Sequence, residues 1–225
     1  LDFNNFIEIK NLSFKYSTSK DDIIKNLSIK INKGDHIGIM GATGSGKSTL
    51  VDLILGIITP NQGDIFCDND SIFKSPKEWR KLIGYVSQFP YLLDGSVIEN
   101  VAVGIDKKNI SKERAIKSLE IANLKNFIMG LNDGLNSQVG ERGVQLSGGQ
   151  IQRLAIARAL YNSPKILILD EATASVDVKT QENIMQDLNE FKKEITMISI
   201  SHDKDALIHC NKIYQLKESK LITNN

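Results

Sequence analysis

A glycine-rich segment has the residue types and spacing of a phosphate-binding loop. Residues 41–49 read Gly-Ala-Thr-Gly-Ser-Gly-Lys-Ser-Thr, which fits the pattern G-x-x-x-x-G-K-[ST] between a predicted strand and a predicted helix. Glycines let successive N–H groups turn toward phosphates, and the positive end of the following helix adds attraction. This context disfavours a chance glycine-rich turn. The expected nucleotide ligands are Gly41, Thr43, Gly44, Ser45, Gly46, Lys47, Ser48 and Thr49, with Lys47 at the β- and γ-phosphates and Ser48 on Mg²⁺.

A second candidate group is the pair of carboxylates that ends an apolar run. Residues 166–171 read Ile-Leu-Ile-Leu-Asp-Glu. We expect Asp170 to lie near Mg²⁺, directly or through water, and Glu171 to orient and polarise an attacking water. Acidic pairs at strand ends are often solvated turn residues, so this prediction depends on the phosphate loop.

A third segment, residues 146–150, reads Leu-Ser-Gly-Gly-Gln and precedes a predicted helix. Ser147, Gly148, Gly149 and Gln150 could form another anion site at a helix N-terminus, with Ser147 as a cap or a phosphate ligand. An ordinary capped helix start has the same spacing. The residues alone leave both readings open.

The elements that must position these groups follow from the apolar pattern. Alternation in residues 12–16 and 27–31 predicts antiparallel strands, whereas continuous apolar runs at 37–40, 83–86, 166–169 and 195–200 predict parallel strands buried on both faces. Apolar spacing of three and four predicts helices over 49–56, 112–122 and 150–161. In the last helix, Ile151, Leu154, Ala155 and Ala159 are expected to share a buried face, with Gln152 and Arg153 pointing away. The stretch 90–160 has no strong strand and predicts a mostly helical lobe within an α/β chain.

Composition narrows the class of protein. The net charge of +1 over 225 residues gives no electrostatic case for a nucleic-acid partner. The two cysteines, Cys67 and Cys210, are expected to be reduced. No apolar run approaches the roughly 20 residues that a membrane span requires. Because the chain begins with Leu1, we expect it to be a piece of something longer.

Taken together, these motifs resemble the nucleotide-binding domain of ATP-binding cassette (ABC) transporters, over essentially all 225 residues. The resemblance implies a P-loop NTPase (RecA-like) fold: a mostly parallel sheet core, an N-terminal antiparallel β subdomain and an inserted α-helical subdomain. It implies one domain, 1–225, with a core lobe of 1–88 and 161–225 and a helical lobe of 89–160 that carries the signature segment 146–150.

The resemblance also implies roles for residues outside the three motifs. Tyr16 matches the aromatic residue that stacks on adenine, and Gln88 matches the glutamine that reaches Mg²⁺ and senses the membrane partner. Asp177 lies in the segment 174–177, which matches the loop that crosses the dimer, and His202 matches the switch histidine at the γ-phosphate. The implied catalytic residues are Glu171, His202, Gln88 and Lys47; the implied metal ligands are Ser48, Gln88 and Asp170. His36 and His209 are expected to be structural, and Trp79 to be a packing residue.

Two segments point to the exporter branch of the family. Residues 140–143 and 89–100 resemble exporter segments, and Phe89, Tyr91 and Leu92 are expected to line a coupling groove unless they form a local core cluster. The implied partners are a transmembrane domain fused N-terminal to the chain and a second copy, bound head to tail around two ATP. The expected function is ATP-driven export or flipping at the cytoplasmic face of a membrane, with a lipid or lipid-linked oligosaccharide as cargo. The alternative is a soluble cassette ATPase acting on DNA or ribosomes; it is disfavoured because no heptads separate Gln88 from Leu146.

Overall fold

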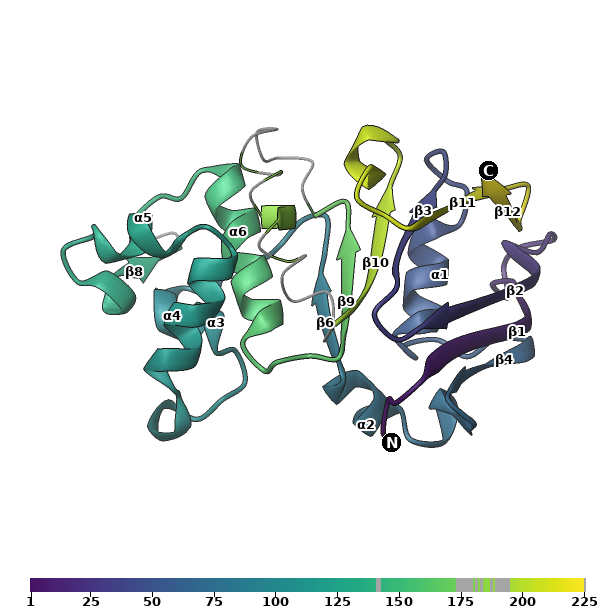
Figure 1. Ribbon diagram of the computed structural model, residues 1–225, viewed down its shortest axis with the longest axis horizontal. Helices are drawn as coiled ribbons and strands as arrows, with labels where there is room; N and C mark the ends of the chain where they lie inside the picture. Colours follow the sequence, from purple (N-terminus) through teal and green to yellow (C-terminus); the bar gives the residue numbers. More distant parts are fainter. Residues whose placement is uncertain are drawn as a thin grey trace. The chain divides into compact units, whose positions relative to one another are not determined.

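The computed structural model describes residues 1–140, 143–172, 180, 182, 184–186, 188 and 195–224 (Figure 1). The contacts divide the chain into two compact units. The first unit comprises Leu1–Ile83, Lys165–Glu171 and Lys192–Asn225, and the second comprises Gly84–Pro164 and Ala172–Phe191. Among the described residues, no helix is both long and apolar enough to cross a membrane.

An antiparallel sheet opens the first unit. Its strands are β1 (Phe6–Phe14), β2 (Ile24–Asn32), β4 (Gln62–Cys67) and β5 (Asp70–Ser71), in the order β2-β1-β4-β5. The register opposes Ile7 to Ile31 and Ile9 to Ile29, and all four side chains are buried. The alternation of apolar and polar residues therefore forms antiparallel strands, as predicted, because residues two apart lie on the same face of a sheet.

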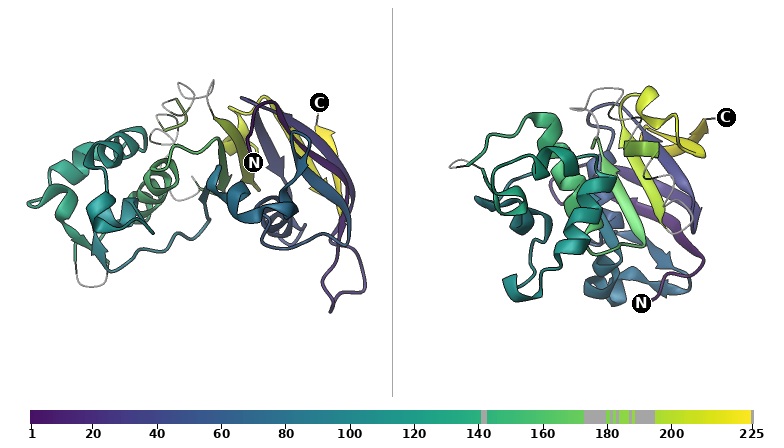
Figure 2. Two further views of the ribbon diagram at one scale, coloured as in Figure 1. Left: turned by 90° about the horizontal axis from the view of Figure 1, so that it is seen from below. Right: turned by 60° about the vertical axis from the view of Figure 1, so that its left-hand side comes forward.

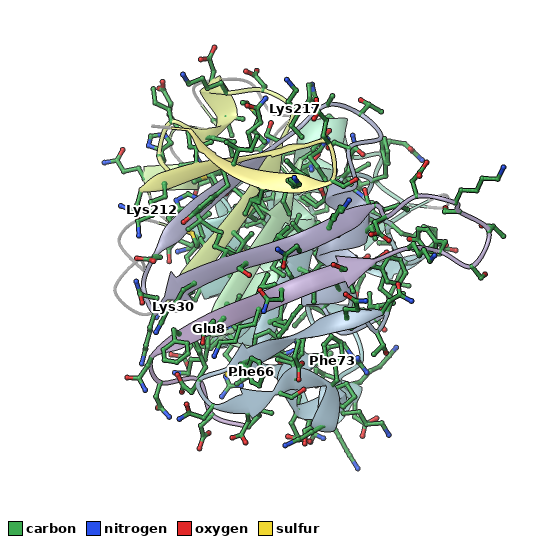
Figure 3. The ribbon with its side chains drawn as sticks, turned by 90° about the vertical axis from the view of Figure 1, so that its right-hand side faces the viewer. Glu8, Lys30, Phe66, Phe73, Lys212 and Lys217 are labelled. Carbon is green, nitrogen blue, oxygen red and sulfur yellow. The ribbon has the colours of Figure 1, made fainter. Side chains whose placement is uncertain are left out.

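The outer face of this sheet is polar and partly aromatic (Figure 3). The Lys30 ammonium lies 3.7 Å from the centroid of the Phe6 ring, and that of Lys10 lies 5.2 Å from the centroid of the Phe66 ring. Lys10 also pairs with Glu8 at 3.0 Å. These contacts cover aromatic surface with cations on the solvent side of the sheet.

The second sheet of the first unit holds the parallel strands. Its order is β12 (Lys220–Asn224), β11 (Lys212–Lys217), β3 (His36–Met40), β10 (Thr196–Ser201) and β9 (Ile166–Asp170). Strands β11, β3, β10 and β9 are parallel, and β12 is antiparallel to β11. The apolar runs in β3, β9 and β10 are buried along almost their whole length, as expected for parallel strands covered on both faces.

Helix α1 (Lys47–Ile54) and both sheets share one hydrophobic core, which includes Ile7, Ile37, Leu50, Ile168 and Ile198. Short elements complete this unit: the 3-10 turns η1 (Ile72–Lys74) and η4 (Asp205–Leu207), and helix α2 (Pro76–Lys81). In α2, Trp79 is fully buried and its Nε1 donates to the Ile54 carbonyl at 2.7 Å, which confirms it as a packing residue. Strand β6 (Ile83–Val86) begins at the boundary between the units.

The second unit is mostly helical, as the sequence predicts. It contains α3 (Val97–Val101), α4 (Lys112–Ile121), α5 (Lys125–Met129), α6 (Gly148–Leu160) and the 3-10 turns η2 (Lys107–Asn109) and η3 (Gly134–Asn136). Helices α3 and α4 pack against α6, and α4 and α6 lie side by side in Figures 1 and 2. Two short strands, β7 (Gly95–Ser96) and β8 (Gln138–Val139), pair antiparallel.

One prediction for α6 was wrong. Gln152 is only 2% exposed, although it was expected to point away from the buried face. The four consecutive residues Leu154, Ala155, Ile156 and Ala157 are also all buried, so α6 is enclosed on more than one face. A single amphipathic stripe therefore does not describe this helix.

Candidate nucleotide-binding site

The phosphate loop connects β3 to α1 in the first unit. Helix α1 begins at Lys47, and the residue at its N-cap position is Gly46, whose φ is 100° and which has no side chain to accept a hydrogen bond from the helix. The Lys47 Nζ donates to the carbonyl oxygens of Gly41 at 2.8 Å and Ala42 at 3.1 Å, so the loop curls around this ammonium group. The first N–H groups of any helix have no intrahelical acceptor. In α1, no side chain at the N-cap position supplies such an acceptor.

Glycine is required at both ends of this loop. A Cβ atom at Gly41 would lie 2.5 Å from the Ser45 Oγ and 2.9 Å from the Leu216 carbonyl oxygen. At Gly46, a Cβ atom would lie 2.9 Å from the Ile23 Cγ2, and the positive φ is itself unfavourable for other residues. The Ser45 Oγ is buried and has no hydrogen-bond partner among the described residues. A narrow loop with an unpaired hydroxyl, a lysine ammonium and an uncapped helix start fits a phosphate group.

The acidic pair lies at the same edge of the sheet as the loop. Register matches Ser201 with Met40 and Ile200 with Asp170, so β3, β10 and β9 end together. Glu171 follows β9 with a φ of 49°, and its amide donates to the Ile200 carbonyl at 2.9 Å. This bond fixes the direction in which the chain leaves the strand. The structure therefore brings Asp170 and Glu171 to the phosphate-loop edge.

His202 comes directly after β10 and lies beside Glu171. Its Nδ1 is 3.2 Å from the Glu171 Oε1; the histidine side chain is 60% exposed, whereas the glutamate side chain is 11% exposed. An imidazole this exposed is not a core residue. His36 differs, because it is 1% exposed and its Nε2 lies 2.8 Å from the Ser199 Oγ, as expected for a structural histidine.

Tyr16 lies two residues beyond the end of β1, near the start of α1. Its ring contacts Phe14 edge to face, with centroids 4.9 Å apart, and its hydroxyl is 3.4 Å from the Thr49 Oγ1. The side chain is 40% exposed. An aromatic ring held at its edge but open to solvent is suited to stacking on a planar ligand.

The remaining predicted site residues do not lie in the unit that contains the phosphate loop. Gln88 and residues 147–150 belong to the second unit. There, Ser147 and Gln150 form a capping box: the Ser147 Oγ accepts from the Gln150 amide at 3.3 Å, and the Gln150 Oε1 accepts from the Ser147 amide at 2.8 Å. This segment therefore starts α6, which does not decide between a cap and a phosphate ligand. Asp177, with the rest of segment 174–177, and residues 141–142 lie outside the described residues.

Sequence reasoning missed an arginine clamp in the second unit. Arg158 donates from Nε to the Asn100 carbonyl at 2.7 Å, from Nη1 to the Tyr91 carbonyl at 2.8 Å and from Nη2 to the Asn100 Oδ1 at 3.1 Å. Burial lowers the pKa of Arg158. The clamp holds the segment in which Phe89 is 84% and Tyr91 is 75% exposed, so the alternative of a local core cluster is wrong for these two residues. An isolated arginine in the apolar run 154–160 was the available signal.

The fold and the loop at its sheet edge define a class of protein. The ABC transporter family matches residues 24–174, and the chain belongs to this family. It is an ATP-binding domain of that family, as the sequence predicted, with the expected P-loop NTPase fold.

Similar proteins come from bacteria and from the eukaryote Dictyostelium discoideum. The chain is 42% identical over 208 residues to the alpha-hemolysin translocation ATP-binding protein HlyB of Escherichia coli O157:H7, covering 92% of this chain and 29% of HlyB. It is 38% identical over 217 residues to the leukotoxin translocation ATP-binding protein LktB of Mannheimia glucosida, covering 96% of this chain and 30% of LktB. The chain thus spans about three tenths of the length of these relatives.

The fold is also found in a solved structure of an exporter. A bacterial Atm1-family ABC exporter with ATP bound matches with a TM-score of 0.91 and 31% sequence identity, covering 98% of this chain and 38% of the exporter chain. Neither this structure nor the relatives favour the alternative of an ATPase that acts on DNA or ribosomes.

Proposed function

We propose that this chain is the motor domain of an exporter, which binds ATP with Mg²⁺, hydrolyses it and drives transport across a membrane. The observation that carries the proposal is the convergence of the phosphate loop, Asp170, Glu171 and His202 at one edge of the parallel sheet. In open α/β sheets, ligands bind outside the carboxyl ends of the strands. The similarity to HlyB, LktB and the Atm1-family exporter supports the exporter class.

Different residues of the proposed site would bind the phosphates, hold Mg²⁺ and activate the attacking water. Lys47 and the first amides of α1 would bind the phosphates, and Ser48, Asp170 and Gln88 would hold Mg²⁺. When bound, Mg²⁺·ATP supplies the γ-phosphoryl group and the positive charge that neutralises the developing oxyanions. Glu171 would take a proton from the attacking water, because its carboxylate is held at the sheet edge by its amide bond to Ile200.

His202 and Tyr16 complete the proposed site. The exposed imidazole of His202, 3.2 Å from the Glu171 carboxylate, would contact the γ-phosphate and orient that carboxylate. The exposed ring of Tyr16 would stack on adenine, and its hydroxyl lies 3.4 Å from the Thr49 Oγ1.

The proposed assembly contains two copies of the chain. In a head-to-tail dimer, Ser147, Gly148, Gly149 and Gln150 of one copy would close the ATP site of the other, and Asp177 would cross the dimer. The chain is proposed to form one domain, with a core lobe of 1–88 and 161–225 and a helical lobe of 89–160. A transmembrane domain, proposed to precede the chain, would contact the exposed Phe89 and Tyr91 from the cytoplasmic face of the membrane.

Two cargo classes are proposed. The first is a lipid or a lipid-linked oligosaccharide, because the sequence as a whole resembles exporters of such cargoes. The second class is a toxin, which the relatives favour because HlyB is named for alpha-hemolysin translocation and LktB for leukotoxin translocation.

The proposed hydrolysis is tested by measuring phosphate release from ATP by the purified chain, with Mg²⁺ and with EDTA. Lys47→Ala should abolish the Mg²⁺-dependent release, and Lys33→Ala, which changes an exposed lysine in the same unit, should not. Equal release by the wild-type chain and Lys47→Ala would contradict the proposed function.

A further inference from the structure

The turn between β11 and β12 has an unfavourable backbone for its residues. The register pairs Lys217 with Lys220, so Glu218 and Ser219 form a two-residue turn, and both have positive φ values, 49° and 64°. Two-residue hairpin turns with positive φ at both positions strongly prefer asparagine and glycine. Strained residues persist where other contacts hold them, and Ser219 makes such contacts.

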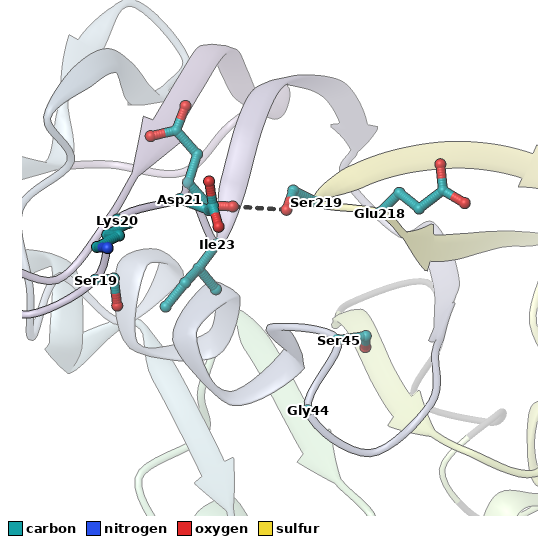
Figure 4. A pocket seen from close by; sticks show the side chains of 9 residues that line it. Ser19, Lys20, Asp21, Ile23, Gly44, Ser45, Glu218 and Ser219 are labelled. Carbon is teal, nitrogen blue, oxygen red and sulfur yellow. Dashed lines mark hydrogen bonds between the residues drawn. The ribbon is translucent and has the colours of Figure 1, made fainter.

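Ser219 is bonded to the chain on both sides of Ile23. Its hydroxyl donates to the Asp22 carbonyl at 2.7 Å, and its carbonyl accepts from the Lys25 amide at 2.7 Å. Figure 4 shows the first of these bonds beside a pocket lined by the hairpin turn, by residues 19–23 and by Gly44 and Ser45 of the phosphate loop. The turn therefore fixes the entry into β2 next to the phosphate loop.

The segment that Ser219 holds rests against the last glycine of the phosphate loop. At Gly46, a Cβ atom would lie 2.9 Å from the Ile23 Cγ2, 3.2 Å from the Ile23 carbonyl oxygen and 3.4 Å from the Ile24 Cδ1. Ile24 is fully buried, so this surface cannot move away without disturbing the core. Gly46 is the N-cap of α1 and precedes Lys47, so its position sets the direction of the first helical amides.

The same hairpin also supports the first glycine of the loop. The Leu216 carbonyl oxygen lies where a Cβ atom at Gly41 would be 2.9 Å away, and Leu216 itself is buried at the end of β11. The hairpin thus contacts Gly41 directly and reaches Gly46 through Ile23. Ser219 joins the two supports, because it belongs to the hairpin and holds the segment that carries Ile23.

We propose that Ser219 is a positioning residue for ATP binding, which holds the phosphate loop in shape through its bonds to Asp22 and Lys25. This role rests on the proposed function only in taking the loop as the ATP-phosphate site. Ser219 touches no reacting atom; it acts through Ile23 on Gly46. The hydroxyl bond to Asp22 is the part of this connection that a side-chain change can remove.

Two glycine substitutions separate this role from simple relief of strain. Ser219→Gly removes the hydroxyl and accepts positive φ; Glu218→Gly accepts positive φ at the neighbouring position and leaves the hydroxyl in place. Both variants should melt at or above the wild-type temperature, since glycine suits the turn. In nucleotide-free protein, hydrogen exchange at the Ser45 and Leu50 amides, which are bonded to the Ala42 and Gly46 carbonyls, should speed up about threefold or more in Ser219→Gly and stay unchanged in Glu218→Gly.

ATP binding supplies the second measurement. The Kd for ATP, measured with Mg²⁺ in the full chain, should rise about three- to tenfold in Ser219→Gly and remain at the wild-type value in Glu218→Gly. Unchanged exchange and Kd in Ser219→Gly, or equal changes in both variants, would overturn the proposal. A wild-type chain that binds no ATP would refute the proposed function instead, and the exchange comparison would still decide the role of Ser219.

Discussion

Glu171 carries the chemical step of the proposed reaction, and its surroundings make a sharp test possible. Its side chain is 11% exposed and lies 3.2 Å from His202, while its amide is bonded to the Ile200 carbonyl. Glu171→Gln keeps the size and the backbone contacts but removes the base. We expect hydrolysis to slow by about a hundredfold or more with ATP binding retained, measured by phosphate release and by ATP titration.

A matched control for this variant is Asp205→Asn, which changes an exposed carboxylate beyond β10 in the same unit. It should leave turnover unchanged. The Glu171→Gln chain should also accumulate with ATP as a dimer that elutes earlier in gel filtration. Near-normal turnover of Glu171→Gln would remove the residue from its assigned role.

His202 is exposed and His36 is buried, so we expect alanine substitutions at the two positions to have opposite kinds of effect. His202→Ala should reduce turnover strongly with little change in ATP affinity or melting temperature, because the side chain is 60% exposed. His36→Ala should instead lower the free energy of unfolding by about 2 kcal/mol, since it breaks a buried hydrogen bond to Ser199. Urea unfolding and phosphate release measured on both variants check this contrast. An unfolded His202→Ala chain would show that the exposed position is structural.

Individual residues also show where sequence reasoning ends. The position of the phosphate loop between β3 and α1 follows from local pattern alone, because the glycines and Lys47 are neighbours in sequence. The burial of Gln152 and the clamp of Arg158 on Asn100 and Tyr91 do not, because both depend on residues distant in the chain. Helical periodicity gives one stripe and cannot reveal a helix buried on several faces.

At the scale of elements, helix α3 owes part of its stability to a charge at its first turn. Glu99 accepts from the Ser96 amide at 2.9 Å and pairs with Lys107 at 2.6 Å; the Lys107 contact and the Ser96 hydrogen bonds lower the pKa of Glu99 to about 2. A carboxyl whose pKa is depressed in the folded state stabilises it above the ordinary pKa, and this contribution is lost as pH falls through the folded value.

We therefore expect Glu99→Gln to be less stable than wild type at pH 7 by about 0.5–1 kcal/mol, because glutamine keeps the cap but loses the ion pair. The difference should shrink as pH falls from 4.5 to 2 and disappear only below pH 2, because the Glu99 carboxyl is still about half ionised at its folded pKa. Urea unfolding across that range measures it. Lys107→Ala should reproduce part of the loss at pH 7. A difference at pH 2 as large as that at pH 7 would show that the charge is not responsible.

Long elements were predictable and very short ones were not. The sequence predicts α4 and α6 to within two residues at each end, because apolar spacing continues over three turns. Strands β7 and β8 have two residues each, too few to show alternation, and they pair only because the chain returns to the same place after more than forty residues. Residues 47–48 were not predicted as helix, since the glycines before them mask the start of α1.

At the scale of the whole molecule, the predicted ATP site divides between the two units. Lys47, Asp170, Glu171 and His202 lie in the first unit, and Ser147 lies in the second. The family resemblance implies that Ser147 serves the ATP of another copy. A single chain cannot test that arrangement, whereas a mixture of two inactive variants can.

The two variants are Lys47→Ala and Ser147→Arg. Each homodimer should be inactive, because Lys47→Ala removes the ammonium group from both sites and Ser147→Arg puts a bulky side chain into both. A heterodimer has one site with both lesions and one with neither, so mixing the variants should recover part of the phosphate release. If dimers are weak, release per chain should also rise with protein concentration.

The capping box requires a control, because Ser147→Arg removes the cap of α6 as well as introducing bulk. Ser147→Ala removes the cap alone and should cost about 1 kcal/mol of stability while leaving much of the turnover. If Ser147→Arg matches Ser147→Ala in melting temperature but lacks turnover, its defect lies in closing the site and not in folding. Recovery on mixing then reports a site built from two copies. Release that neither recovers on mixing nor depends on concentration would instead place every required residue within one copy of the chain.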